Sequence, residues 1–313
     1  MGRVFRIVAT LGMLTFVAFP TLTNAPTQNR ALLSILELQP SATVIFGGDM
    51  LFDRTIRQVM EREGEDFIFS CVAPVPRDAD LVVANLEGTI TEYPSVSLGS
   101  KIGSPENFVF TFSTSTGKLL SLYNIRLVNL GNNHILDFGW EGVSSTLENL
   151  RAAGVGYFGD PIDKKVAREE IHGISLAFIG YNEFAPGGWR DSVSTTLDQL
   201  YTARLEGFVP IVYTHWGDEY VKSASPRVRE LAHAFVDAGA GIVIGSHPHV
   251  VQEHEVYKGK HIYYSLGNFF FDQYRDESVR HGLLLRVVFN ANGVGRLEEI
   301  PIDNQTDRRT CVL

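Results

Sequence analysis

The sequence predicts an α/β fold in which a mostly β core is covered by helices. Short apolar runs, typical of buried strands, alternate along the chain with stretches of helical periodicity at about 141–153, 194–207 and 226–239. Strands that alternate with helices favour a sheet with helices packed on its faces. From about residue 251 the chain becomes richer in β patterns, at His261–Leu266 and Leu283–Phe289.

Five of the apolar runs are followed closely by polar residues that can bind a metal ion. In open α/β sheets, ligands sit at the carboxyl ends of the strands, so five such ends predict one shared site. The runs and their polar residues are Thr43–Phe46 with Asp49, Leu81–Ala84 with Asn85 and Glu87, Arg126–Leu130 with Asn132, Asn133 and His134, Pro210–Tyr213 with His215, and Gly241–Ile244 with His247 and His249.

Length and charge exclude some function classes. A chain of 313 residues is long enough to bury a substantial core. Its 27 Lys and Arg residues stand against 36 Asp and Glu residues, which gives a formal charge of −9. We see no cluster of Lys and Arg, and phosphate contacts need one, so we expect no nucleic-acid partner.

The N-terminus predicts export. Arg3 and Arg6 precede an uncharged apolar stretch, Ile7–Pro20, and a small-x-small sequence ends at Ala25. This arrangement is typical of a secretory signal. Pro26 would follow the cut directly and should fit a peptidase poorly. An uncleaved membrane anchor is the alternative, although the stretch is short for a span of about 20 residues.

The sequence contains two cysteines, Cys71 and Cys311. Export would permit a disulfide between them. Two isolated cysteines more often stay unpaired, and we expect that here. Neither cysteine has the spacing of a zinc site, and neither has the surroundings of a reactive nucleophile.

The first two strand ends carry carboxylates. Asp49 follows Gly47 and Gly48, and glycine lets the backbone turn sharply and approach a ligand closely. Asn85 and Glu87 are two residues apart, so they share a face if the strand geometry continues. Alone, Asp49 is as typical of a turn as of a site, and the Asn85 and Glu87 pair is more typical of a solvated strand end.

The third strand end is more specific. The run Asn132, Asn133 and His134 directly follows an apolar strand and has no packing role, and Asp137 stands three residues on. This pattern favours a functional site, although Asn132 or Asn133 can also cap the next helix.

The last two ends supply imidazoles. A lone histidine such as His215 is weak evidence, whereas the pair His247 and His249 is stronger. Pro248 should hold the intervening backbone extended and so place both rings on one side. Two imidazoles at a strand end suit zinc, manganese, iron or nickel. The remaining histidines fall inside helical or strand patterns and are interpreted as core or surface residues; they are His172, His233, His254, His261 and His281.

Other catalytic patterns are missing from the sequence. It contains no G-x-S-x-G elbow, no Walker A loop and no H-E-x-x-H helix.

Six motifs in this order resemble the CapA family of poly-γ-glutamate capsule synthesis proteins, over about residues 42–290. That family is similar in fold to the calcineurin-like metallophosphoesterases, so the resemblance implies a four-layered αββα sandwich with a two-metal site at the strand ends. The motifs are Gly48-Asp49, Asn85-Leu86-Glu87, Gly131-Asn132-Asn133-His134-Ile135-Leu136-Asp137, His215-Trp216-Gly217, His247-Pro248-His249-Val250 and Tyr264-Ser265-Leu266-Gly267-Asn268-Phe269.

The resemblance also implies roles for the residues. His134 would be the general acid, with Asp137 orienting its ring unless Asp137 has a surface or capping role. The superfamily's bridging aspartate would correspond to Glu87 or, less well, to Asn85. Ligands to one or two divalent ions, Mn, Fe or Zn, would be Asp49, Glu87, Asn133, His215, His247 and His249. Pocket residues that contact substrate would be Asn85, Asn268 and Asp272.

One departure from the superfamily concerns the first motif. Metallophosphoesterases have Asp-x-His there, but Met50 and Leu51 follow Asp49 in this chain. The site therefore lacks one histidine, and we expect either a single tightly bound metal or two held unequally.

We therefore expect a CapA-like, metal-dependent hydrolase or transferase in the making or processing of a surface polymer. The alternatives are a general phosphoesterase, such as a nucleotidase or phosphodiesterase, and a non-catalytic scaffold for a membrane polymer synthase. The expected partners are an anionic polymer or phosphoester and subunits of such a synthase. The expected segments are a signal peptide or anchor at 1–25, a linker at 26–40, one domain at 41–302 and a C-terminal tail at 303–313.

Overall fold

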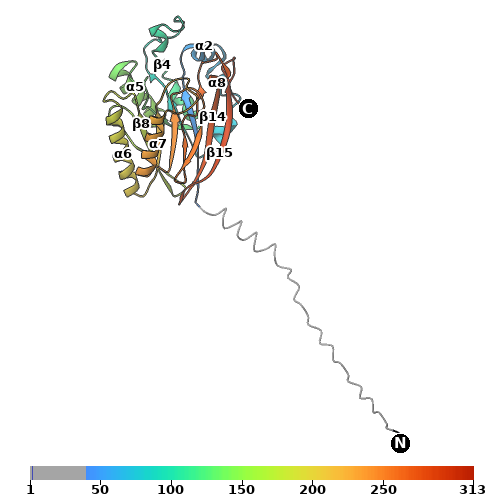
Figure 1. The fold of residues 1–313 in the computed structure, drawn as a ribbon. Coiled ribbons are helices and arrows are strands. Elements are labelled where there is room, and N and C mark those ends of the chain that lie inside the picture. The colour runs from blue at the N-terminus through green and yellow to red at the C-terminus, as the bar shows by residue number, and fades with distance from the viewer. Residues whose placement is uncertain (1, 3–39) are drawn as a thin grey trace. The chain divides into compact units, whose positions relative to one another are not determined.

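The computed structural model describes residue 2 and residues 40–313 (Figure 1). Apart from their single described residues, the predicted signal segment 1–25 and linker 26–40 lie outside this part of the chain. Pro40–Leu313 forms one compact unit. Within the described residues, no helix is both long enough and apolar enough to cross a membrane.

The first sheet has eight strands. Seven follow the order β16-β15-β14-β1-β2-β5-β6, and β13 pairs with β1. β1, β2, β5 and β6 run parallel, so their carboxyl ends meet at one edge, whereas β14, β15 and β16 add to the sheet antiparallel. The strands are β1 (Ala42–Met50), β2 (Leu81–Leu86), β5 (Ile125–Asn129), β6 (Gly156–Phe158), β13 (Asn268–Phe270), β14 (His281–Asn290), β15 (Gly293–Asn304) and β16 (Thr310–Val312).

The second sheet has six strands in the order β11-β12-β10-β9-β8-β7. Its central strands β8, β9, β10 and β12 are parallel, and β7 and β11 are antiparallel edges. A separate pair is formed by β3 (Thr89–Ile90) and β4 (Thr111–Phe112). The strands of the second sheet are β7 (Ala167–Ile171), β8 (Ile174–Asn182), β9 (Val209–His215), β10 (Ile242–Ser246), β11 (His254–Tyr257) and β12 (Lys260–Tyr263).

Three apolar cores separate four layers. Adjacent residues of β1 point to opposite faces, so Ile45 packs with Leu120 on the outer face while Phe46 packs with Tyr213 between the sheets. Phe235 belongs to the third core, where α6 and α7 cover the second sheet side by side (Figure 1). The helices are α2 (Arg54–Glu63), α3 (Pro74–Arg77), α4 (Thr116–Leu122), α5 (Gly139–Ala152), α6 (Trp189–Leu205), α7 (Pro226–Ala238) and α8 (Glu277–Arg280), with 3₁₀ turns η1 (Glu65–Phe69) and η2 (Pro105–Phe108).

Helix α7 shows how the local sequence sets an element. The side chain of Ser225 caps the helix by accepting from Val228 N at 3.3 Å, and Pro226 fills the first helical position, where no amide proton is needed. Gly239 ends the helix with a φ of 114°, a conformation that costs other residues energy. The apolar stripe that includes Phe235 then faces the second sheet.

The structure confirms the α/β class, and the order of its layers is αββα. Two expectations need correction. The predicted tail at 303–313 is wrong, because β16 pairs with β15 through Ile302 and Val312 and extends the first sheet. Gly48 allows close packing against the backbone of Gly267 and is not explained by approach to a ligand. A Cβ at this position would lie 1.8 Å from the carbonyl oxygen of Gly267.

The cysteines also differ from expectation. Cys71 and Cys311 form a disulfide across a sequence separation of 240 residues. The prediction that they stay unpaired is wrong because β16 brings the end of the chain beside η1, a contact that no local pattern encodes.

Cys71→Ser is expected to lower the free energy of unfolding by about 2–5 kcal/mol, the usual loss when a native disulfide is removed. Denaturant titration of the oxidised protein measures the loss. Cys311→Ser should cost a similar amount, and the double variant should cost no more than either single change, because one bond is lost in each case. Single variants as stable as the parent protein would contradict this prediction.

Candidate metal centre

The predicted strand ends meet in one place. Backbone pairing sets Asp49 of β1 opposite Asn85 of β2 and Asn268 of β13. In the other sheet, His215 at the end of β9 is opposite Ser246 at the end of β10. All five side chains are fully buried. The two sheets therefore bring their carboxyl ends together around a shared buried polar cluster.

Two groups of potential metal ligands overlap in this cluster. Glu87 groups with His215 and His247, and it also groups with Asp49 and His249. Within each group the ligand atoms lie within 4.8 Å of one another, and every residue is buried. Glu87 belongs to both groups, so its carboxylate would be a ligand in either of them.

One atom of Glu87 marks the centre. Its Oε1 lies 3.6 Å from His249 Nε2, 3.9 Å from His134 Nε2 and 4.0 Å from His215 Nε2. Within residues 40–313 this buried oxygen has no hydrogen-bond partner. Leaving a buried acceptor unsatisfied costs about 1–3 kcal/mol, and more for a charged group. A divalent cation would satisfy this oxygen, so the donor set fits a metal ion.

Burial and charge set the protonation of these ligands. Burial, followed by the neighbouring Asp49 carboxylate, raises the pKa of Glu87 well above its ordinary value. Burial opposes ionisation of Asp49 as well, but the hydrogen bond and charge of His249 hold the pKa of Asp49 below its ordinary value. Burial lowers the pKa of His215 and brings that of His247 to about 4. Both imidazoles are therefore neutral near pH 7, the form that binds metal.

Asn133 points its amide oxygen toward the same ligands. Asn133 Oδ1 lies 2.7 Å from His215 Nε2, and His215 Nε2 lies 3.1 Å from His247 Nδ1. The oxygen and the two imidazoles thus converge from three different elements. The amide oxygen of Asn133 is therefore close enough to these imidazoles to be a further candidate ligand.

The backbone at the two last histidines is strained. His247 has a φ of 97° and His249 a φ of 56°, in the region that L-residues rarely adopt. Their rings lie with centroids 6.0 Å apart, so they do converge as predicted. An extended backbone at Pro248 does not by itself explain this convergence, because both flanking histidines have a positive φ. Such strain at buried polar residues is typical of functional sites.

His134 is more exposed than the other histidines that face Glu87. Its Nδ1 lies 2.9 Å from Asp137 Oδ2, so the aspartate orients the ring. The same Asp137 oxygen accepts from Phe110 N at 2.7 Å, and the Phe110 ring lies 4.3 Å from the His134 ring. His134 Nε2 is left facing Glu87.

A family of bacterial proteins matches most of this chain. Residues 43–273 match the family described as "Bacterial capsule synthesis protein PGA_cap". The chain belongs to this family. The chain is 34% identical over 273 residues to "PGA biosynthesis protein CapA" of Bacillus subtilis. The match covers 82% of this chain and 70% of that protein.

Two further comparisons are more distant. "Capsule biosynthesis protein CapA" of Bacillus anthracis is 29% identical over 281 residues, covering 84% of this chain and 67% of the relative. Among solved structures, TT1561 of Thermus thermophilus has 12% identity and a TM-score of 0.46, covering 82% of this chain and 97% of its own.

In this chain, the side chain of Asn85 is fully used by contacts inside the fold. Its Nδ2 donates to Asp49 Oδ1 at 2.8 Å and lies 3.5 Å from Glu87 Oε2. Its Oδ1 accepts from Asn129 at 3.0 Å and from Asn132 at 3.1 Å. We therefore revise the substrate-binding prediction for Asn85. Its amide contacts the carboxylates of Asp49 and Glu87 and holds them in position.

Asn268 and Asp272 also need revision. Asn268 Oδ1 lies 2.9 Å from His249 Nδ1, and the fully buried Asn268 thereby orients that imidazole. Partners of this kind are as typical of metal sites as the ligands themselves. Asp272 forms an ion pair with Arg54 and accepts a hydrogen bond from Thr55 Oγ1 at 3.0 Å. Its carboxylate therefore positions these two residues and is not free to contact substrate.

The sequence alone predicted no role for Asn129, and it indicated Asn132 only as a polar residue at a strand end or a helix cap. Asn132 Nδ2 donates to Leu86 O at 2.8 Å, and Asn132 Oδ1 accepts from His134 N at 3.0 Å, so it links two strand ends. A signal for Asn129 was present, because an asparagine inside an otherwise apolar strand is out of pattern and has to be satisfied by hydrogen bonds.

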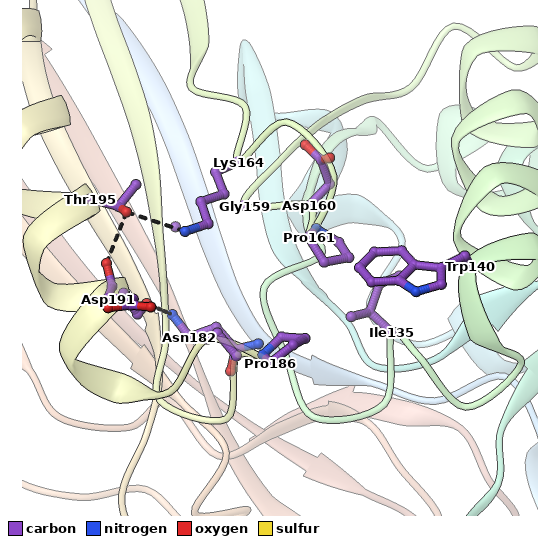
Figure 2. A pocket seen from close by; sticks show the side chains of 14 residues that line it. Ile135, Trp140, Gly159, Asp160, Pro161, Lys164, Asn182, Pro186, Asp191 and Thr195 are labelled. Carbon is purple, nitrogen blue, oxygen red and sulfur yellow. Dashed lines mark hydrogen bonds between the residues drawn. The ribbon is translucent and has the colours of Figure 1, made fainter.

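A small cavity lies beside the centre. It encloses about 110 Å³, and none of the predicted site residues lines it. Figure 2 shows Thr195 and Lys164 on one side and Trp140 on the other, and Lys164 Nζ donates to Thr195 Oγ1 at 3.3 Å. Asn182 lines the cavity and donates to Asn132 O at 3.0 Å, so the cavity borders the turn that carries Asn133 and His134.

Glu87→Gln is expected to stabilise the chelator-treated protein at pH 7 by about 1–3 kcal/mol, because it removes a buried carboxyl with no hydrogen-bond partner at Oε1 and a raised pKa, which favours the unfolded chain above pH 4.5. Below the ordinary pKa of about 4.5 the carboxyl is protonated in both folded and unfolded chains. As the pH rises above that value, the unfolded chain releases the proton first and the parent protein loses stability.

The difference between Glu87→Gln and the parent protein should therefore be small near pH 4 and should grow as the pH rises. Denaturant titrations at several pH values in the presence of chelator measure it. A difference that stays constant with pH would contradict the prediction.

Proposed function

We propose that this chain is an exported, metal-dependent hydrolase or transferase that makes or processes an anionic surface polymer. The name of the Bacillus subtilis relative supports PGA, poly-γ-glutamate, as the polymer, and that of the Bacillus anthracis relative supports a capsule. The basic and apolar N-terminal segment supports export. Membrane subunits of a polymer synthase would be its partners.

A single observation carries the proposal. The buried Glu87 Oε1 has three imidazole Nε2 atoms within 4.0 Å and no hydrogen-bond partner in the described chain. An unsatisfied acceptor of this kind destabilises the fold unless a ligand occupies the space. Shared membership of Glu87 in two ligand groups supports one or two divalent ions, Mn, Fe or Zn.

The residues of the centre divide into three roles. Asp49, Glu87, Asn133, His215, His247 and His249 would hold the metal, which would supply Lewis acidity toward an oxygen of the substrate. Asn85 and Asn268 hold these ligands in place. His134 faces the centre without belonging to either ligand group, and Asp137 fixes its ring.

The proposed step is hydrolysis of an amide bond. The oxygen of water bonds to the carbonyl carbon, the C–N bond breaks, and the leaving nitrogen takes a proton. Protonated His134 would give that proton from Nε2 and become the neutral imidazole, and a proton from the attacking water would then restore the imidazolium. In the transfer version, an amine of another chain takes the place of water.

The test is a substrate panel with the purified full-length protein. Poly-γ-glutamate of defined length, p-nitrophenyl phosphate and bis-p-nitrophenyl phosphate are each supplied with Mn²⁺ or with chelator. Chain length on a gel, released amine and released nitrophenol are measured. Metal-dependent shortening or joining of the polymer is expected, and His247→Ala should abolish it while His233→Ala should not.

The other outcomes are equally clear. Metal-dependent turnover of the phosphate esters with an unchanged polymer would replace the proposal by a general phosphoesterase. Bound metal with no turnover of any substrate would favour the scaffold of a polymer synthase.

A further inference from the structure

We infer that a groove beside the metal centre, lined by Arg54, Arg275 and Arg308, binds carboxylates of the polymer on one side of the reacting bond. This arginine groove encloses about 750 Å³. The inference rests on the proposed function, because it assumes an anionic chain that reaches the centre.

The groove concentrates positive charge on an acidic protein. Three arginines line it against two acidic residues, Asp272 and Glu219, in a chain whose net charge is −9. Asp272 is already paired with Arg54. Within the described residues, Arg308 has no carboxylate partner, and the nearest carboxylate oxygen to Arg275 is that of the exposed Asp276 at 4.0 Å. Arg308 donates from Nε to Thr55 Oγ1 at 2.9 Å and from Nη1 to Thr306 O, which leaves its Nη2 and the guanidinium of Arg275 available to an anion.

Aromatic rings hold each guanidinium in position. The guanidinium carbon lies 4.9 Å from the Phe110 ring for Arg54, 3.5 Å from the Tyr220 ring for Arg275 and 4.1 Å from the Tyr274 ring for Arg308. Stacked arginines keep their planar donors free for carboxylate oxygens, and they lose little side-chain entropy when they bind. The groove is therefore organised before a ligand arrives.

The groove and the metal centre share their walls. Tyr220, beneath Arg275, stacks with the ring of His249 at a centroid distance of 6.0 Å. Gln273 donates to Tyr220 Oη at 2.9 Å and accepts from Asn268 at 3.3 Å, and Asn268 orients His249. A chain held in the groove would therefore lie directly beside the ligands.

Arg54 makes a second connection. Its guanidinium lies over both Phe110 and Phe271, and these rings pack against His134 and His249 at 4.3 and 4.5 Å. The backbone of Arg54 has a φ of 50°, and its buried Nε has no hydrogen-bond partner within residues 40–313. Backbone strain together with an unsatisfied buried donor is typical of residues that contact a ligand.

These features favour a flexible chain with a regular series of carboxylates. Arginine pairs well with planar carboxylates, and an extended groove meets several of them at once. Phosphate oxygens could pair with the same donors, so the experiment has to separate the two chemistries.

The test measures binding of a fluorescent γ-linked oligoglutamate to the full-length protein in chelator, where no turnover occurs. The double variant Arg275→Gln, Arg308→Gln is expected to weaken binding by about tenfold or more, because hydrogen bonds to charged groups contribute most to such contacts. Arg296→Gln is the matched control, since Arg296 is exposed on β15 and lies outside the groove. Arg275→Gln alone, at an exposed side chain, guards against a folding defect.

Three results would overturn the inference: equal weakening by Arg296→Gln, equal binding of an uncharged γ-linked oligoglutamine, or tighter arginine-dependent binding of polyphosphate than of oligoglutamate. Turnover assays separate this from the proposed function. If the arginines govern binding but the metal supports no turnover, the proposed function fails and the groove stands. If turnover is intact and the groove variants leave KM unchanged, the groove fails alone.

Discussion

His134→Ala is expected to retain its bound metal and to lose turnover by about 10²–10⁴-fold, the usual cost of removing a general acid. His134 belongs to neither ligand group, yet its Nε2 lies 3.9 Å from Glu87 Oε1. Its other nitrogen is held by Asp137 at 2.9 Å. The ring is therefore fixed with one nitrogen toward the centre, in position to move a proton.

Metal content and turnover should be measured on the same preparation of His134→Ala. Asp137→Asn is the companion variant, and it should lose less activity than His134→Ala because the imidazole stays present but less well oriented. Loss of metal from His134→Ala would make His134 a ligand. Full capsule formation in cells that carry only His134→Ala would favour a scaffold without chemistry at this site.

His247→Ala and His249→Ala are expected to weaken metal binding by more than about 10–100-fold. That range is typical for losing a residue that merely supports a ligand, and a direct ligand should cost at least as much. Each histidine belongs to a different ligand group, and the groups share Glu87. If two ions bind, each variant should lose one ion first.

His233→Ala and His254→Ala are the matched controls. Both histidines lie away from the centre: His233 pairs with Glu255 at 2.8 Å, and His254 stacks on Tyr263. Elemental analysis after dialysis, together with calorimetric titration of the metal, gives stoichiometry and affinity. Equal metal content in all four variants would refute the ligand assignment.

The fold and most of the cluster could be predicted because both depend on local pattern. Each strand that carries Asp49, Glu87, Asn133, His215 or His247 is an apolar run, and parallel strands bring such ends together. The run Ile174–Asn182 carries the same signal and forms β8, although it did not enter the strand prediction.

The roles of individual side chains were harder to predict. Asn85 and Asn268 look like any other polar residue in the motifs, and only the hydrogen bonds to Asp49 and His249 reveal that they position ligands. The arginine groove joins residues more than 200 positions apart, Arg54 and Arg275 among them, and such contacts leave no periodic trace in the sequence.

The bond between Cys71 and Cys311 has a consequence for the order of synthesis. With two cysteines in the sequence, Cys71 has no other intramolecular partner until Cys311 has been made. Until then it stays a free thiol, exposed to disulfides with other molecules. The disulfide at β16 therefore forms last, and a chain that stops before Cys311 lacks it and keeps an unpaired cysteine.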